Sequence, residues 1–221
     1  MPSFGQQLET LARWREFPAL ERLDEERVAL TFDDGPDPDG TPGVLDALDA
    51  AGLKATFFMV GEQVKAAPAL AREVASRGHE IALHGATHRL HRDLNPRDSK
   101  DEPAYGLGTL EAATARRPRW FRPPYGEFNE HSYEAVRAVG LEPVYWSAWG
   151  MDWETISAER ILDLVERDLE PGAIVVLHDS ARYGHRPDVA ATIEAIPLIA
   201  ARAAERGLDL GPLQAGAASP G

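Results

Sequence analysis

The stretch of sequence that decides the fold is Val28-Ala29-Leu30-Thr31-Phe32-Asp33-Asp34-Gly35-Pro36. Its first five residues suit a buried strand, because β-branched and aromatic side chains pack well on a pleated surface. Gly35-Pro36 ends the strand and forces a turn. Asp33 and Asp34 therefore meet at a strand end, where a bound cation is the simplest way to neutralise two adjacent carboxylates. An ordinary acidic turn is the alternative for this stretch taken alone.

The composition is that of a globular protein with an acidic surface. The chain has 221 residues, of which 43% are hydrophobic and 27% charged, enough for one sizeable domain. Its formal charge of −13 argues against nucleic acid and anionic membrane surfaces as partners. The chain has no cysteine, which excludes thiolate catalysis, disulfides and cysteine zinc sites. Any metal must be bound by histidines and carboxylates.

The two ends of the sequence differ from its middle. Residues 1–27 are expected to form an N-terminal helix or arm, and residues 214–221 a disordered tail. Residues 1–27 lack the apolar core of a signal peptide, so we expect a cytoplasmic protein. No stretch approaches the roughly 20 apolar residues that a membrane span requires.

Short apolar strands alternate with helices along residues 28–213, which predicts a single α/β domain with parallel strands. After the strand in 28–36, further strands are expected at 55–60, 79–84, 120–122, 142–147, 173–178 and 208–210. Helices are expected at 41–51, 68–77, 109–115, 130–139, 157–169 and 188–206. The long polar segment 89–108 departs from a helical pattern.

Polar residues follow five of these strands at the point where each strand ends. They are Asp33 and Asp34, His84 with His88 just beyond it, Arg122, Asp152, and His178 with Asp179. In parallel β/α folds the carboxyl ends of the strands form the rim where sites are assembled. Folding requirements alone do not explain acids, histidines and an arginine at five strand ends, so the pattern predicts a functional site.

His84 and His88 are candidates for metal ligands. They are four residues apart, so a helical turn after the strand would put both rings on one side. Two histidines and one carboxylate are a common catalytic zinc set that leaves a position for water, and Asp34 can supply the carboxylate. A pair of surface histidines is the alternative for this spacing alone. His79 and His91 are expected to be solvated, and the arginines around His91 make it a poor ligand.

Two other residues are candidates for acid–base catalysis. Asp33 faces away from Asp34 in extended chain, so it could take a proton from a metal-bound water, whose pKa is about 7. His178 could protonate a leaving amine, with a satisfied core histidine as the alternative. Asp152 could orient His178, and Arg122 could orient Asp33. For both pairs a plain structural ion pair is the alternative.

Three tryptophans, at positions 146, 149 and 153, lie beside this polar rim. Packing in the core or at the rim explains them most simply. Three aromatic rings within eight residues would also suit a wall on which a sugar stacks.

Together these residues resemble the NodB-homology polysaccharide deacetylases, carbohydrate esterase family 4, over about residues 28–210. Five family motifs occur in order: TFDDGP at 31–36, H-x-x-x-H at 84–88, RPPYG at 122–126, a D-x-x-D-W-like segment at 149–153, and L-x-H at 176–178. The chain departs from the family at three places. Gly85 stands where Ser or Thr is preferred, Trp149 where Asp is usual, and Val176 where Leu is usual.

The resemblance implies a distorted (β/α)7-type barrel of parallel strands and a metal-dependent hydrolase. The expected substrate is an N-acetylated amino sugar or polysaccharide, and the expected cofactor is one divalent ion, zinc first, with cobalt, nickel or manganese as alternatives. By match, the metal ligands would be Asp34, His84 and His88, the base Asp33 and the acid His178. Arg122 and Asp152 would tune these two, the Tyr125 backbone N–H would hold the oxyanion, and Tyr125, Trp149 and Trp153 would bind substrate.

Other functions fit parts of the pattern. A small acylated amine or an O-acetyl ester is the chief alternative substrate, because no export signal is seen. A phosphatase of the haloacid dehalogenase type needs two aspartates separated by one residue, whereas Asp33 and Asp34 are adjacent. A non-catalytic sugar- or metal-binding module would have lost its acid or base, but Asp33 and His178 are both present.

Overall fold

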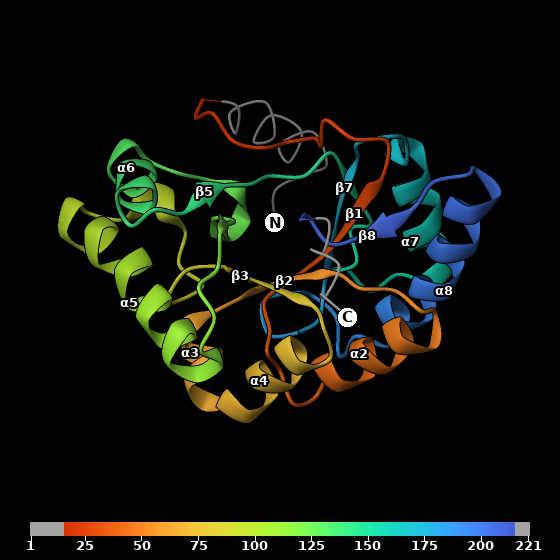
Figure 1. The fold of residues 1–221 in the computed structure, drawn as a ribbon, viewed down its shortest axis with the longest axis horizontal. Helices are drawn as coiled ribbons and strands as arrows, with labels where there is room; N and C mark the ends of the chain where they lie inside the picture. Colours follow the sequence, from red (N-terminus) through yellow and green to blue (C-terminus); the bar gives the residue numbers. More distant parts are fainter. Residues whose placement is uncertain (1–15, 215–221) are drawn as a thin grey trace, which may run out of the picture.

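A computed structural model describes residues 16–214, in which a parallel sheet curls into a half-barrel wrapped by helices (Figure 1). Within these residues seven strands lie in the order β5-β4-β3-β2-β1-β7-β6, and β8 pairs with β1. The strands are β1 Val28–Asp33, β2 Thr56–Met59, β3 Glu80–Leu83, β4 Trp120–Phe121, β5 Glu142–Pro143, β6 Ala148–Trp149, β7 Ile174–His178 and β8 Leu210–Gly211. The predicted single-domain, distorted (β/α)7-type barrel is confirmed.

The register of the sheet aligns the carboxyl ends of its central strands. Asp33 at the end of β1 lies opposite Phe58 of β2 and His178 of β7. Arg122, which directly follows β4, donates its backbone N–H at 3.0 Å to the carbonyl of Leu83, the last residue of β3. Because every strand in the sheet is parallel to its neighbours, the residues that follow β1, β3, β4 and β7 reach one rim.

The helices form an arc around the outside of the strands (Figure 1). They are α2 Thr41–Ala50, α3 Gly61–Ala66, α4 Pro68–Ser76, α5 Pro96–Thr114, α6 Glu130–Ala138, α7 Ala158–Val165 and α8 Ala190–Glu205, with 3-10 turns η1 His91–Asp93, η2 Pro124–Gly126 and η3 Glu166–Asp168. The main core lies between this arc and the sheet, and includes the stacked rings of Phe32 and Phe57. Burying both faces of the sheet explains why β1, β2 and β7 read as nearly continuous apolar runs.

The segment 89–108 departs from our prediction, because α5 begins at Pro96 rather than at 109. The side chain of Asn95 caps the helix by accepting the Asp98 N–H at 2.9 Å, and Pro96 occupies a first-turn position where proline is tolerated. An interior proline, Pro103, and two glycines hid the helical pattern. One of them, Gly106, lets the helix approach the backbone of the loop after β3, because an added Cβ would lie 2.9 Å from the Ala86 nitrogen. Helix α3 was not predicted.

The prediction that His79 and His91 are solvated is wrong, since both are buried. His79 packs edge-on against Phe57, and His91 packs against the rings of Phe121 and Phe128. Burial lowers the pKa of His79 to about 4 and that of His91 to about 3. Both rings are therefore neutral core groups at physiological pH.

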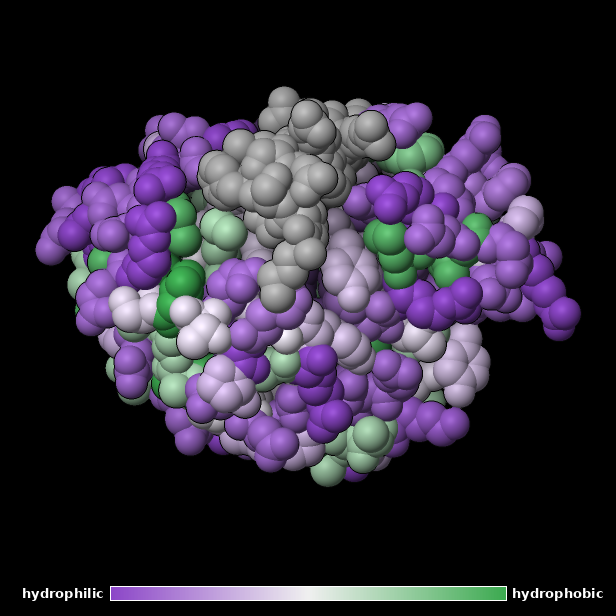
Figure 2. Space-filling view, turned by 180° about the vertical axis from the view of Figure 1, so that it is seen from behind, coloured by the Kyte–Doolittle hydropathy of each residue, from purple (hydrophilic) through white to green (hydrophobic). Residues whose placement is uncertain are grey.

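The ends of the chain are described only in part. Of the predicted N-terminal helix or arm, residues 16–27 are described, and they are irregular except for a bridge between Leu20 and Val144. The predicted tail lies outside the described residues except for Gln214. None of the helices in residues 16–214 is long and apolar enough to cross a membrane. The face in Figure 2 is mainly hydrophilic, with small separate apolar patches, as the net negative charge leads one to expect.

Candidate active site

The residues that follow the strand ends line one cleft of about 660 Å³. The predicted residues that line it are Asp33, Asp34, His84, His88, Tyr125, Trp149, Trp153 and His178. Arg122 and Asp152 lie behind the cleft wall, where both are buried. The fold thus brings every predicted site residue to the rim or directly behind it, and a volume of this size is typical of small-molecule sites.

Asp34, His84 and His88 have the arrangement of a metal site. One ligand atom from each lies within 4.8 Å of those of the other two. The Nε2 atoms of His84 and His88 are 3.5 and 3.1 Å from Asp34 Oδ1. Burial alone would raise the pKa of Asp34, but the two imidazoles, when they are protonated and no metal is bound, hold that pKa well below its usual range. The carboxylate is therefore ionised, as a metal ligand must be.

The contacts around these three residues fit a divalent ion. His84 Nδ1 lies 2.8 Å from the Arg122 carbonyl, to which it can only donate, so in the neutral imidazole the Nε2 that faces Asp34 carries no proton and can bind a metal. Asp34 Oδ1 is buried and has no hydrogen-bond donor among the described residues. A buried carboxylate oxygen without a donor, facing two imidazole nitrogens, is what a zinc-type ligand set presents before the ion binds.

Asp33 is held by a buried arginine. Arg122 is fully buried, and its Nη1 donates to Asp33 Oδ1 at 2.6 Å and to the Thr31 hydroxyl at 2.8 Å. Its Nη2 donates to the Tyr145 carbonyl at 2.9 Å, and its guanidinium lies 4.0 Å from the ring centroid of Phe58. The other carboxylate oxygen, Oδ2, is 3.9 Å from His84 Nε2. Asp33 is thus fixed beside the metal site and keeps one oxygen turned toward it.

His178 is held by Asp152 across the cleft. Asp152 Oδ1 is 2.8 Å from His178 Nδ1, and Oδ2 accepts the His178 backbone N–H at 2.9 Å. Burial alone would lower the pKa of His178, but the charge and hydrogen bond of Asp152 raise it to about 9. The imidazole is therefore protonated at neutral pH, and Nδ1 donates to Asp152. That leaves Nε2 as the nitrogen free to give a proton to a ligand in the cleft.

Backbone strain is concentrated at this rim. Four non-glycine residues in the described part of the chain have positive φ, and three of them are Asp34 at 85°, Tyr125 at 60° and Met151 at 51°. The fourth, Ala115, ends helix α5. L-residues rarely adopt this conformation, and such outliers persist mainly where a site needs them. Here the three residues are a candidate metal ligand (Asp34), the tyrosine of the RPPYG motif (Tyr125) and the residue before Asp152 (Met151).

The comparison with known proteins agrees with this geometry. The sequence profile described as Polysaccharide deacetylase matches residues 21–144, more than half of the chain. The chain belongs to the polysaccharide deacetylase family. A chitooligosaccharide deacetylase from Bradyrhizobium sp. (strain ANU 289) is 34% identical over 84% of this chain and 88% of its own length.

Solved structures of polysaccharide deacetylases have the same fold. A peptidoglycan N-acetylglucosamine deacetylase in complex with an N-oxidanyl-benzamide has a TM-score of 0.82 and 30% identity, covering 88% of this chain and 90% of that one. A family 4 pseudoenzyme from Bacillus anthracis has a TM-score of 0.76 and 26% identity, covering 86% of this chain and 64% of that one. Because the family includes a pseudoenzyme, the residues of the site carry the argument for activity.

Aromatic rings of this member of the polysaccharide deacetylase family enclose the candidate metal site. Tyr183 stacks on His88 with centroids 3.9 Å apart and planes 7° apart, and Tyr125 meets His88 edge-on at 4.7 Å. On the other side Trp153 meets both Trp149 and the His178 ring at 5.5 Å. These contacts fix the planes of the two imidazoles. The same aromatic rings form walls of the cleft against which a sugar ring can pack.

Sequence reasoning missed three residues that support the site. They are Glu102, Tyr183 and Arg186. Asp179 was recognised at the end of the β7 strand but was given no role, and it accepts the Gly35 N–H at 2.9 Å. Glu102 comes from α5, the helix that the sequence did not predict there. Its Oε1 accepts the Thr87 N–H at 2.7 Å and the Thr87 hydroxyl at 2.9 Å, and so holds the loop between the two candidate ligands His84 and His88.

Glu102 also explains the glycine where the family prefers Ser or Thr. Gly85 has φ +85°, and a Cβ there would lie 2.9 Å from the Thr87 carbonyl oxygen and 3.2 Å from Glu102 Oε1. Gly85→Ala should lower the free energy of unfolding by about 1–3 kcal/mol, measured by urea denaturation. Gly108→Ala is the matched control, because nothing lies within 4 Å of a Cβ there. That helical substitution should raise stability by roughly 0.5–1 kcal/mol; equal effects at both positions would contradict the steric argument.

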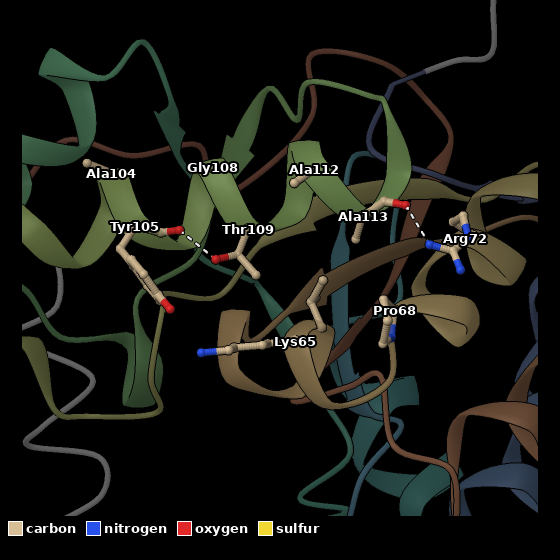
Figure 3. Close-up of a pocket in the computed structure, with 10 residues that line it drawn as sticks. Lys65, Pro68, Arg72, Ala104, Tyr105, Gly108, Thr109, Ala112 and Ala113 are labelled. Atoms are coloured by element: carbon tan, nitrogen blue, oxygen red, sulfur yellow. Dashed lines mark hydrogen bonds between the residues drawn. The ribbon is translucent and has the colours of Figure 1, made fainter.

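A second hollow, of about 600 Å³, lies away from the strand ends between α3, α4 and α5 (Figure 3). Small and apolar residues make up much of its lining, with Lys65 and Tyr105 at one end and Arg72 at the other. Arg72 reaches across it to the Ala113 carbonyl at 3.3 Å. The hollow has no carboxylate or imidazole in its lining, so the acid–base chemistry belongs to the rim cleft.

Proposed function

We propose that this chain is a metal-dependent deacetylase that removes an acetyl group from an N-acetylated amino sugar of an oligosaccharide or polysaccharide. One observation carries the proposal. A buried Arg122–Asp33 pair and a pair of buried Asp152 with part-buried His178 face a candidate three-ligand metal site from two sides of one cleft. The relatives named above, one a chitooligosaccharide deacetylase and one a peptidoglycan N-acetylglucosamine deacetylase, support the substrate class.

Asp34, His84 and His88 would hold the divalent ion, zinc first, with cobalt, nickel or manganese as alternatives. When bound, the ion would act as a Lewis acid and make a water molecule more acidic. Because His84 donates from Nδ1 to the Arg122 carbonyl, it presents Nε2 to the ion. The Tyr183 ring, which stacks on His88, fixes the orientation of the His88 imidazole beside Asp34.

Asp33 would act as the general base. Its Oδ2 faces the site, while Arg122 binds Oδ1 and keeps the carboxylate oriented. It takes the proton of the attacking water as the oxygen adds to the acyl carbon. The backbone N–H of Tyr125 would donate to the oxyanion that forms.

His178 would act as the general acid. Asp152 fixes Nδ1, so Nε2 delivers the proton to the amine nitrogen as the C–N bond breaks. An amine is a poor leaving group without that proton. Trp149 and Trp153 would pack on the sugar rings beside it.

The test couples metal analysis with acetate release. Purified protein should contain one zinc ion per chain and release acetate from N-acetylated chitooligosaccharides or peptidoglycan fragments. Chelation should reduce release to background, and stoichiometric Zn²⁺ should restore it. Small N-acetylated amines and O-acetyl esters form the comparison set. Faster turnover of these than of any sugar would assign the alternative substrate class, and full activity without metal would refute the mechanism.

A further inference from the structure

A buried arginine lies behind the proposed acid, in a position that none of the family motifs contains. Asp152 accepts four hydrogen bonds: two from His178, one from the Thr192 hydroxyl at 2.7 Å and one from Arg186 Nη1 at 3.2 Å. The carboxylate is thus shared between the imidazole on the cleft side and a guanidinium on the inner side. Its environment has two cationic partners rather than one.

Arg186 is built into the loop after β7 rather than lying on the surface. Its side chain is 3% exposed. Its Nη2 donates to the carbonyls of His178 at 2.9 Å and Ser180 at 3.1 Å, and its Nη1 also reaches the Thr192 hydroxyl of α8. Burying a guanidinium this deeply is costly unless its charge is compensated, and the only carboxylate within ion-pair distance among the described residues is Asp152.

The charges explain what this arginine supplies. When His178 is protonated, it compensates the buried Asp152 carboxylate. When His178 gives its proton to a leaving group, that compensation is lost. If Asp152 had no other cationic partner, its buried charge would oppose this transfer, because it favours the protonated form of His178. Arg186 keeps Asp152 compensated in both states. It also helps hold Asp152 ionised: burial opposes ionisation, but the charges of His178 and Arg186 keep the pKa of Asp152 below its usual range.

We infer that Arg186 is a positioning residue for proton delivery: it holds the Asp152 carboxylate in place and compensates its charge while His178 protonates the leaving amine. The inference rests on the proposed role of His178 as the acid. The site then has two matched halves, because Arg122 does for the base Asp33 what Arg186 does for the acid through Asp152.

The experiment compares a substrate that needs leaving-group protonation with one that does not. Diacetylchitobiose releases an amine, whereas para-nitrophenyl acetate releases a stable phenolate without an added proton. In the zinc-loaded enzyme, Arg186→Met should lower kcat for diacetylchitobiose by about ten- to a hundredfold with KM little changed. Hydrolysis of para-nitrophenyl acetate should fall by no more than about threefold, since it does not use the acid. Retained ester hydrolysis also shows that the variant has folded.

Two controls make the result specific. Arg182→Met removes another arginine of the same loop, one that pairs with Asp37 at 3.2 Å and is 47% exposed, and it should leave both rates unchanged. Arg186→Lys retains the charge but not the planar fork, so its loss should be smaller than that of Arg186→Met.

His178→Asn separates failure of the inference from failure of the proposed function. It should show the same selective loss of amide hydrolysis as Arg186→Met. If His178→Asn is selective but Arg186→Met lowers both rates equally, or neither, the role given to Arg186 is wrong. If His178→Asn itself lowers both rates equally, the assignment of His178 as the acid is wrong, and the inference falls with it.

Discussion

Asp33→Asn should lower kcat for N-acetyl hydrolysis by about 10²- to 10⁴-fold while the protein still binds one metal ion, because the change removes a base and no ligand. Asp33 Oδ1 accepts a hydrogen bond from Arg122, and Asp33 Oδ2 is 3.9 Å from Nε2 of the proposed ligand His84. Asparagine has the same shape and still offers an oxygen to Arg122. The measurement is kcat with acetate as the product, together with metal content by elemental analysis.

His84→Ala is the matched comparison, because it removes a ligand and leaves the base in place. It should lose both the metal and the activity. Thermal unfolding of both metal-free variants shows whether either change has disturbed the fold. Normal turnover by Asp33→Asn would refute its assignment as the base, and full metal content in His84→Ala would refute the ligand set.

The sequence predicted the strand ends and the site together because both depend on one local pattern. Short apolar runs that end in a polar residue specify β1, β3 and β7. Parallel pairing then sets their ends level, so Asp33 lies opposite His178 without further information. The positions of the polar residues at these strand ends could therefore be predicted from the order of motifs.

Residues that support the site through tertiary contacts could not be predicted in this way. Arg186 and Tyr183 lie in an irregular loop, and only its docking shows that one meets Asp152 and the other His88. The start of α5 was missed because interior proline and glycine weaken helix propensity, and packing against the loop after β3 outweighs that preference. His91 was placed in solvent because arginines precede and follow it, but its ring faces two phenylalanines.

Arg122→Met should have the largest effect on stability of any single change at this site. Arg122 is fully buried and binds Asp33, Thr31 and the Tyr145 carbonyl. Its removal leaves the Asp33 carboxylate buried without its cation, which should lower the free energy of unfolding by about 3–5 kcal/mol. Urea denaturation of metal-free protein at neutral pH measures the loss, and chelating the metal beforehand keeps ion binding out of the comparison.

A double-mutant cycle tests whether the loss comes from the stranded charge. If it does, Asp33→Asn combined with Arg122→Met should be less destabilising than the sum of the two single changes, by roughly 1–3 kcal/mol, because neither charge is then left alone. Additive losses would instead assign the effect to packing of Arg122 against Phe58 and to its bond with the Tyr145 carbonyl. Coupling would mean that the Arg122–Asp33 ion pair has two functions. It orients the base, and it stabilises the fold by joining the end of β1 to the end of β4.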